Sequence, residues 1–255
     1  MMHTAVTEKH QTARESQVIE EFIHQLEEAP VSRKKLVALL AEERQRSKPL
    51  KMTYQEFLEW ADEDTLAEWV DGEVIMSSPA SLPHQRIAGF LVNILNMFVV
   101  SKDLGIVLSA PFQMKLEHGR EPDILFISKA HLDRLKGTYL EGPADLVVEV
   151  ISPESAGRDR GDKFYEYERG GVPEYWLIDP LIHRAEFYQM DAAAKQYRSI
   201  TPESDTSYHS TVLPGFWLRI DWLWQNPLPH PLQVLAEIAG VDPRQVEQFM
   251  QLLTG

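Results

Sequence analysis

A single glutamate interrupts an otherwise apolar run near the middle of the chain. Residues 144–155 read ADLVVEVISPES, and the alternation of a β-strand places Glu149 on one face with Val147 and Ile151, whereas the other face is entirely apolar. Burying an unpaired carboxylate costs several kcal/mol, so the group must be paired, protonated or bound to a cation. The chemistry predicted for this chain depends on which of the three applies.

A second carboxylate stands at the start of another apolar run. Asp123, in EPDILFI, follows a proline, which fixes φ and removes a backbone donor, so we expect a strand that begins here with its carboxylate at the rim. Two carboxylates on neighbouring strands can converge on one point, and such oxygen ligands suit Mg²⁺ or Mn²⁺. Taken alone, Glu149 fits a structural ion pair equally well, and Asp123 fits an ordinary strand-start residue.

The segment after the Glu149 strand supplies a cation. In RDRGDKFYEYERGG, Asp159, Lys163 and Tyr167 are four residues apart and share one face of a helix predicted over about 158–169. A Ser-Pro pair turns the chain back before this helix, so we expect Lys163 to reach toward the carboxylates. Two acids, a metal ion and a lysine would form a site for phosphodiester hydrolysis. The same spacing also fits a surface ion pair between Asp159 and Lys163.

The elements that must position these residues can be predicted from caps, turns and periodicity. They are, in order, a short helix YQEFLEWA opened by a Thr53–Glu56 capping box, a hairpin at Asp71-Gly72, a long helix from Ser81 that ends at Gly105, strands over 106–110, 112–116, 123–127 and 145–152, the polar helix, and the strands EYWLID, AEFYQM, KQYRSI and YHSTVL. This order predicts an α/β (α+β) fold with a mixed central sheet, flanking helices and extra antiparallel strands.

The chain divides into three predicted parts. Residues 1–50 form a helical N-terminal extension, residues 51–226 form the main domain, and residues 227–255 form a C-terminal helical extension. The N-terminal extension is amphipathic, a pattern that fits packing on the main domain or on a second copy of the chain.

Composition limits the function classes. The chain has 255 residues and a net charge of −14, from 25 basic and 39 acidic residues, which argues against avid nonspecific nucleic-acid binding but leaves room for a local groove or a cation-recruiting site. Cysteine is absent, so disulfides, thiolate zinc sites and cysteine nucleophiles are excluded. The first residues lack an apolar leader, and the longest apolar run, over 87–100, is too short to span a membrane. We therefore expect a cytoplasmic protein without a membrane partner.

Several segments, in this order, resemble the Uma-two family of the PD-(D/E)XK nuclease superfamily. They are AEWVDGEVIMSSPASLPHQRI, EPDILFI, ADLVVEVISPES, RDRGDKFYEYERGGVPEYWLIDP and LPGFWLRI, and together they cover about residues 52–223. The resemblance implies a restriction-endonuclease-like main domain and an Mg²⁺-dependent endonuclease that acts on DNA. It also implies a homodimer, since many nucleases of this superfamily cut as dimers.

The resemblance assigns roles residue by residue. Asp123 would be the motif aspartate and Glu149 the motif acidic residue, both as metal ligands. The superfamily lysine would fall at position 151, which is Ile151 here. In this family the lysine function is moved to the following helix, which here offers Lys163, in agreement with the spacing argument.

Three further residues are expected around the same pocket. Glu68 matches the family's upstream glutamate and would add a carboxylate to the metal, His84 matches the start of the long helix, and Asp159 would support the site. Simpler interpretations exist, because Glu68 also fits the polar face of a hairpin and His84 fits a solvated residue in a first helical turn.

The favoured hypothesis is a metal-dependent endonuclease-like hydrolase that cleaves DNA. The alternative is a catalytically inactive nuclease-fold module for protein interaction or regulation, which the displaced lysine, the acidic net charge and the lack of a basic stripe favour. A third option is a metal-dependent hydrolase of small phosphate esters or nucleotides, whose substrates tolerate acidic surroundings better.

Overall fold

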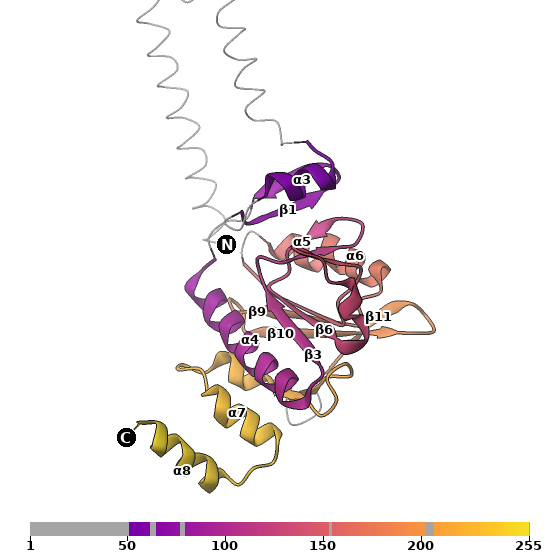
Figure 1. The fold of residues 1–255 in the computed structure, drawn as a ribbon. Helices are drawn as coiled ribbons and strands as arrows, with labels where there is room; N and C mark the ends of the chain where they lie inside the picture. Colours follow the sequence, from indigo (N-terminus) through magenta and orange to yellow (C-terminus); the bar gives the residue numbers. More distant parts are fainter. Residues whose placement is uncertain (1–50, 62–64, 77–79, 153–154, 202–206, 255) are drawn as a thin grey trace, which may run out of the picture. The chain divides into compact units, whose positions relative to one another are not determined.

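The computed structural model describes residues 51–61, 65–76, 80–152, 155–201 and 207–254 (Figure 1). All of them belong to one unit, Leu50–Gly255. The helical extension predicted over residues 1–50 lies outside the described residues.

A mixed six-stranded sheet forms the centre of this unit. Its strand order is β11-β10-β9-β8-β6-β3. The strands are β3 (Gly105–Ser109), β6 (Ile124–Ser128), β8 (Leu146–Val150), β9 (Glu174–Asp179), β10 (Arg184–Asp191) and β11 (Gln196–Ile200). Strands β8 and β9 pair in parallel and the other neighbours pair antiparallel. The predicted mixed central sheet with added antiparallel strands is confirmed.

Helices pack on both faces of this sheet (Figure 1). Their bounds are α3 (Tyr54–Trp60), α4 (Leu82–Lys102), α5 (Ala156–Arg160), α6 (Asp162–Gly170), α7 (Pro231–Ile238) and α8 (Pro243–Thr254), with 3₁₀ turns η1 (Lys129–Arg134) and η2 (Ile220–Trp224). The capping box predicted for the first of these is present, since Thr53 and Glu56 cap each other's backbone N–H.

The long helix α4 begins where predicted and ends earlier. The Ser81 hydroxyl accepts from the backbone N–H of His84, which caps the helix. The helix stops at Lys102, and Asp103 takes a left-handed conformation with φ 55°. The predicted end at Gly105 is therefore three residues beyond the last helical residue. Gly105 opens β3 instead, where a Cβ would lie 2.1 Å from a backbone oxygen of the neighbouring β6.

Strand β8 places its two faces in two separate hydrophobic cores. Val148 packs with the α4 side chains in one core, whereas Val147 and Ile151 pack with Tyr167 of α6 in the other. Glu149 lies on the second face, where the Tyr167 hydroxyl donates to it. The alternation predicted for this strand is confirmed.

A second sheet carries the hairpin and the segment before Asp123. Its order is β2-β1-β5-β4-β7, from β1 (Ala67–Val70), β2 (Glu73–Met76), β4 (Gln113–Lys115), β5 (Gly119–Arg120) and β7 (Tyr139–Glu141). The hairpin turn is confirmed, with positive φ at both Asp71 and Gly72, as a primed turn requires. The strand predicted over 112–116 forms β4, so it belongs to this second sheet.

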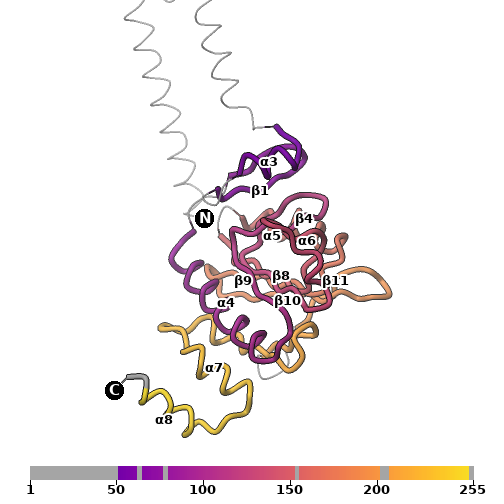
Figure 2. Tube along the Cα trace, viewed as in Figure 1, coloured from indigo at the N-terminus to yellow at the C-terminus, as the bar shows by residue number. Residues whose placement is uncertain are grey.

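The C-terminal segment adds two helices and a small sheet. Strands β12 (Ser207–His209) and β13 (Trp217–Arg219) pair antiparallel. Helix α7 lies beside α4 (Figure 2), and its Val234 packs in the core that contains the α4 side chains. Helix α8 follows and contacts α7.

Candidate active site

Lys163 is buried among three carboxylates. Its Nζ lies 2.9 Å from Glu68 Oε1, 2.9 Å from Glu149 Oε1 and 3.4 Å from Asp159 Oδ1. Only 5% of the lysine is exposed. Burial opposes its charge, but the carboxylates dominate and raise the pKa of Lys163 well above its ordinary value. The side chain is therefore an ammonium ion bound to β1, β8 and α5 at once.

The helix that carries Lys163 is interrupted just before it. A single helix was expected over about 158–169, but Gly161 separates α5 from α6. A Cβ at Gly161 would lie 2.8 Å from the carbonyl oxygen of Gly157, so glycine permits this close turn. Despite the break, Asp159 and Lys163 remain on one face, as the four-residue spacing predicts.

The negative charge around Glu149 exceeds the positive charge that its partners supply. Lys163 Nζ and the Tyr167 hydroxyl both donate to its Oε1, at 2.9 and 2.8 Å. Burial raises the pKa of Glu149 to about 8; Lys163 opposes this, and the charges of Asp159 and Asp123 add to it. Further positive charge is needed before this carboxyl ionises fully at neutral pH.

Asp123 lies beside Glu149, at the start of the neighbouring strand. Ile124 pairs with Val148 in the antiparallel ladder between β6 and β8, so the next positions along, Asp123 and Glu149, lie side by side. The backbone N–H of Val150 donates to Asp123 Oδ2 at 2.6 Å. This bond holds the carboxylate against the edge of β8.

His84 meets the other oxygen of Asp123. Its Nε2 lies 3.1 Å from Asp123 Oδ1, and the residue is 8% exposed, so it is not a solvated first-turn histidine. Burial lowers the pKa of His84, but the hydrogen bond and charge of Asp123, with the charge of Asp159, raise it overall. The first turn of α4 therefore touches the same cluster.

Glu68 is also buried rather than on the polar face of its hairpin. It is 4% exposed and accepts from Lys163, from the Arg120 guanidinium at 3.2 Å and from the backbone N–H of Glu121 at 3.3 Å. Burial raises its pKa, but Lys163 and Arg120 lower it more, so the pKa of Glu68 falls below its ordinary value. All six residues predicted for the site thus lie in one cluster, in which five are buried and Asp123 is partly exposed.

The sequence of this chain matches a known family over this same region. The family profile of Uma2, described as "Putative restriction endonuclease", matches residues 54–221, which is more than half of the chain. The chain belongs to the Uma2 family. The predicted resemblance is confirmed. The matched range contains all six predicted site residues.

The Uma2 chain also resembles a solved structure. That crystal structure is described as "a putative nuclease belonging to DUF820 from Anabaena variabilis ATCC 29413". The TM-score is 0.58 at 18% sequence identity, and the match covers 68% of this chain and 97% of the other. At this identity the likeness shows the fold.

No curated protein matches the Uma2 chain. Among its described helices, none has the length and apolar content that crossing a membrane requires.

Three buried residues of the Uma2 cluster were not predicted. Arg120, 2% exposed, donates from Nε to Glu166 Oε2 at 2.8 Å, in addition to its bond to Glu68. His118 Nδ1 lies 2.8 Å from the same Glu166 oxygen. Glu166 follows Lys163 by three residues, a helical spacing that could have indicated a shared face. Arg120 had no comparable signal.

The donor set of this Uma2 site fits a divalent cation. Glu68, Glu149 and Asp159 surround one lysine, and Asp123 lies beside Glu149. Both side-chain oxygens of Asp159 are buried without a hydrogen bond. Within the described ranges, no three acidic or imidazole side chains form a ready metal cage. Mg²⁺ commonly binds through one or two carboxylates, with water and substrate phosphate as the other ligands. The Asp123–Glu149 pair meets that requirement.

Proposed function

We propose that this Uma2 protein is a divalent-metal-dependent endonuclease-like hydrolase that cleaves phosphodiester bonds in DNA. One observation carries the proposal: Lys163 Nζ lies 2.9 Å from both Glu68 and Glu149, next to the strand start that holds Asp123. Membership of a family described as restriction endonucleases supports the nuclease class. The buried acidic cluster supports the requirement for metal.

Asp123 and Glu149, with Glu68, would hold Mg²⁺ or Mn²⁺. When bound, such an ion supplies positive charge at the phosphate and a water of lowered pKa. The protein prepares Asp123 by fixing one oxygen with the Val150 N–H and the other with His84. Each carboxylate oxygen of Asp123 accepts one of these two hydrogen bonds and has a second lone pair left for a metal ion.

Lys163 would assist the attacking water or neutralise charge that develops on the phosphate. In the free protein the Lys163 ammonium group forms ion pairs with Glu68, Glu149 and Asp159. Asp159 holds the longest of the three contacts, at 3.4 Å. We infer that this contact is exchanged when substrate binds, which leaves Asp159 as a supporting residue.

A second candidate function also has an observation in its favour. Lys163 is already ion-paired with three carboxylates, and the described residues hold no three-ligand metal group. These features fit a nuclease fold retained as a non-catalytic module for protein interaction or regulation. Calorimetry separates the two proposals, because such a module would bind neither Mn²⁺ nor Mg²⁺ at millimolar concentration.

The nuclease proposal is tested by plasmid cleavage. Supercoiled DNA is incubated with the wild type, Glu149→Gln and Lys163→Met, in Mg²⁺, in Mn²⁺ and in EDTA. We expect metal-dependent nicking by the wild type and a loss of about 100-fold or more in each variant. Glu117→Gln, a change at an exposed glutamate, is the matched control and should cleave normally. Equal nicking by all four proteins would count against the proposal.

The assembly and location of this protein are proposals that rest on the family resemblance and on composition. We propose a homodimer in the cytoplasm, with the domain limits near residues 50 and 226 predicted above. Sedimentation of the full chain and of a chain starting at residue 51 tests whether a dimer forms and whether the N-terminal extension contributes to it.

A further inference from the structure

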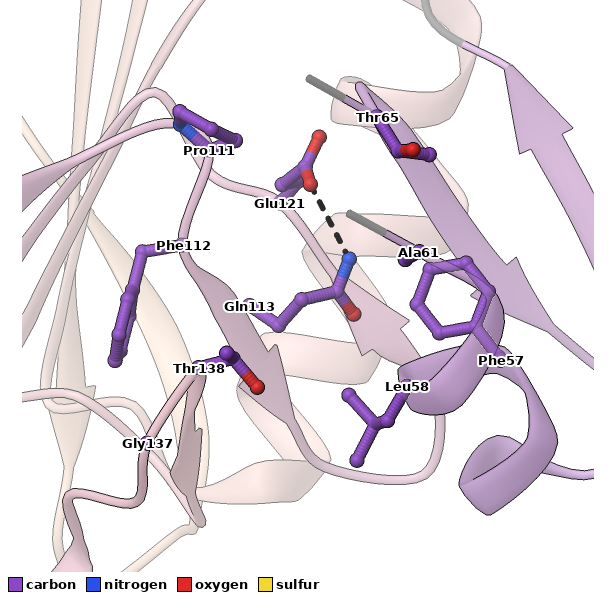
Figure 3. A pocket seen from close by; sticks show the side chains of 10 residues that line it. All are labelled: Phe57, Leu58, Ala61, Thr65, Pro111, Phe112, Gln113, Glu121, Gly137 and Thr138. Carbon is purple, nitrogen blue, oxygen red and sulfur yellow. Dashed lines mark hydrogen bonds between the residues drawn. The ribbon is translucent and has the colours of Figure 1, made fainter. Parts of the chain in front are cut away.

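A cavity of about 370 Å³ lies next to the candidate active site and has no part in the chemistry proposed above (Figure 3). Phe57 and Leu58 of α3, Phe112 and Gln113 at the start of β4, and Glu121 line it. Its volume falls at the small end of the range, about 300–1,000 Å³, in which proteins hold small organic groups.

The cavity and the carboxylate cluster share a wall. Glu121 precedes Asp123 by two residues, and its backbone N–H donates to Glu68 Oε1 at 3.3 Å. The side chain of Glu121 faces the cavity, while its backbone faces the cluster. A nucleotide whose phosphate lies at Asp123 therefore has this cavity beside it.

The lining combines apolar rings with a hydrogen-bond acceptor. Figure 3 shows Phe112 on one side, Phe57 and Leu58 on the other, and the Glu121 carboxyl between them. The Gln113 amide donates to Glu121 Oε1 at 3.3 Å and to the Ala67 carbonyl at 2.8 Å, which holds the carboxyl in place.

Glu121 is the lining residue whose side chain can accept a hydrogen bond from a ligand. None of the ion pairs found among the described residues involves it, although its carboxyl is partly buried. A carboxyl oxygen keeps acceptor capacity in both protonation states, so Glu121 can receive an N–H donor from a molecule in the cavity. Apolar walls with one acidic acceptor suit a flat heterocycle with an amino group.

We propose that this cavity binds one unstacked nucleobase with an exocyclic amino group, from a nucleotide next to the bond that is cleaved. The inference rests on the proposed function and names its substrate class. The apolar rings provide the contact surface for the base, and the carboxyl accepts from the amino group, as acidic side chains do with cytosine. Bulged, mismatched or single-stranded DNA is then the substrate, because a fully paired duplex does not present such a base.

The test compares DNA ligands on the wild-type protein. Fluorescence anisotropy in Ca²⁺, with the DNA checked for integrity, gives the affinity for duplexes carrying one bulged cytosine, one bulged thymine or one abasic residue at the same position. We expect the cytosine duplex to bind about tenfold tighter than the abasic one, since stacking and hydrogen bonding to a base have this size. Thymine has no amino group and should bind between the two.

Variants locate the preference in the cavity. Glu121→Ala should remove the difference between cytosine and thymine, and Phe112→Ala should reduce the difference between cytosine and the abasic residue. Glu117→Ala removes an exposed glutamate paired with Arg169 and should leave both ratios unchanged. Thermal unfolding checks that each variant folds. The comparison of the three DNA ligands on the wild-type protein does not depend on any variant, so the proposal can be tested even if a variant fails to fold.

The outcomes separate this inference from the proposed function. Equal affinity for base-bearing and abasic bulges, in a protein that cleaves DNA, overturns the base pocket and leaves the nuclease standing. A protein that neither binds nor cleaves any of these DNAs overturns both.

Discussion

Arg120 and Lys163 bind opposite oxygens of the same buried carboxylate, that of Glu68. The guanidinium lies 3.2 Å from Oε2 and the ammonium 2.9 Å from Oε1. Arg120 also holds Glu166 at 2.8 Å, so one buried arginine fixes two acids. The position of the lysine thus depends on an arginine that does not touch it.

Replacing Arg120 with methionine should therefore destabilise the protein and weaken its activity together. The change removes one buried cation from two buried carboxylates, a loss of about 3–5 kcal/mol in the free energy of unfolding. Urea titration measures it. Arg169→Met removes an exposed ion pair with Glu117 and should change stability by less than about 1 kcal/mol. Similar losses in both variants would contradict the role given to Arg120.

Gly161 offers a test of how the helix break positions Lys163. We expect Gly161→Ala to destabilise the fold by about 1 kcal/mol or more, because its Cβ would lie 2.8 Å from the Gly157 carbonyl oxygen. We also expect a lower cleavage rate, since α6 must shift to relieve the contact. Gly157→Ala is the control: its Cβ has no neighbour within 4 Å, and it should be neutral or slightly stabilising. Matching effects at both glycines would argue against the close turn.

The pKa of Glu149 predicts a pH dependence of stability in EDTA. Its folded pKa of about 8 lies above the ordinary value of 4.5, so between these pH values the native state holds a proton that the unfolded state has lost. The stabilising contribution is complete below about pH 4.5 and disappears as the pH rises through about 8. Chemical denaturation between pH 5 and 9 should therefore show the wild type losing stability relative to Glu149→Gln. Parallel curves for the two proteins would exclude the shift.

Much of the site could be predicted from local patterns. The alternation of β8 placed Glu149 on the correct face, and the proline before Asp123 marked a strand start. The spacing of Asp159 and Lys163 indicated a shared face even though a glycine divides the helix, because the break preserves the side on which both residues lie.

The rest depended on tertiary packing. Arg120 lies on the two-residue strand β5, which is too short to have a periodicity, and only sheet pairing brings it to Glu68. The division into two sheets could not be predicted for a similar reason. Strand β4 has three residues, and its pairing with β7 joins segments more than 20 residues apart. Nothing local in the sequence specifies such a partner.

Anomalous diffraction from a crystal soaked in Mn²⁺ tests the central claim most directly, that Asp123 and Glu149 form a metal site beside Lys163. We predict an anomalous peak about 2.0–2.2 Å from an oxygen of each carboxylate in the wild type, and no peak in Glu149→Gln. The absence of a peak between these two residues after a soak in millimolar Mn²⁺ would contradict this claim. A peak that persists in Glu149→Gln would contradict it as well.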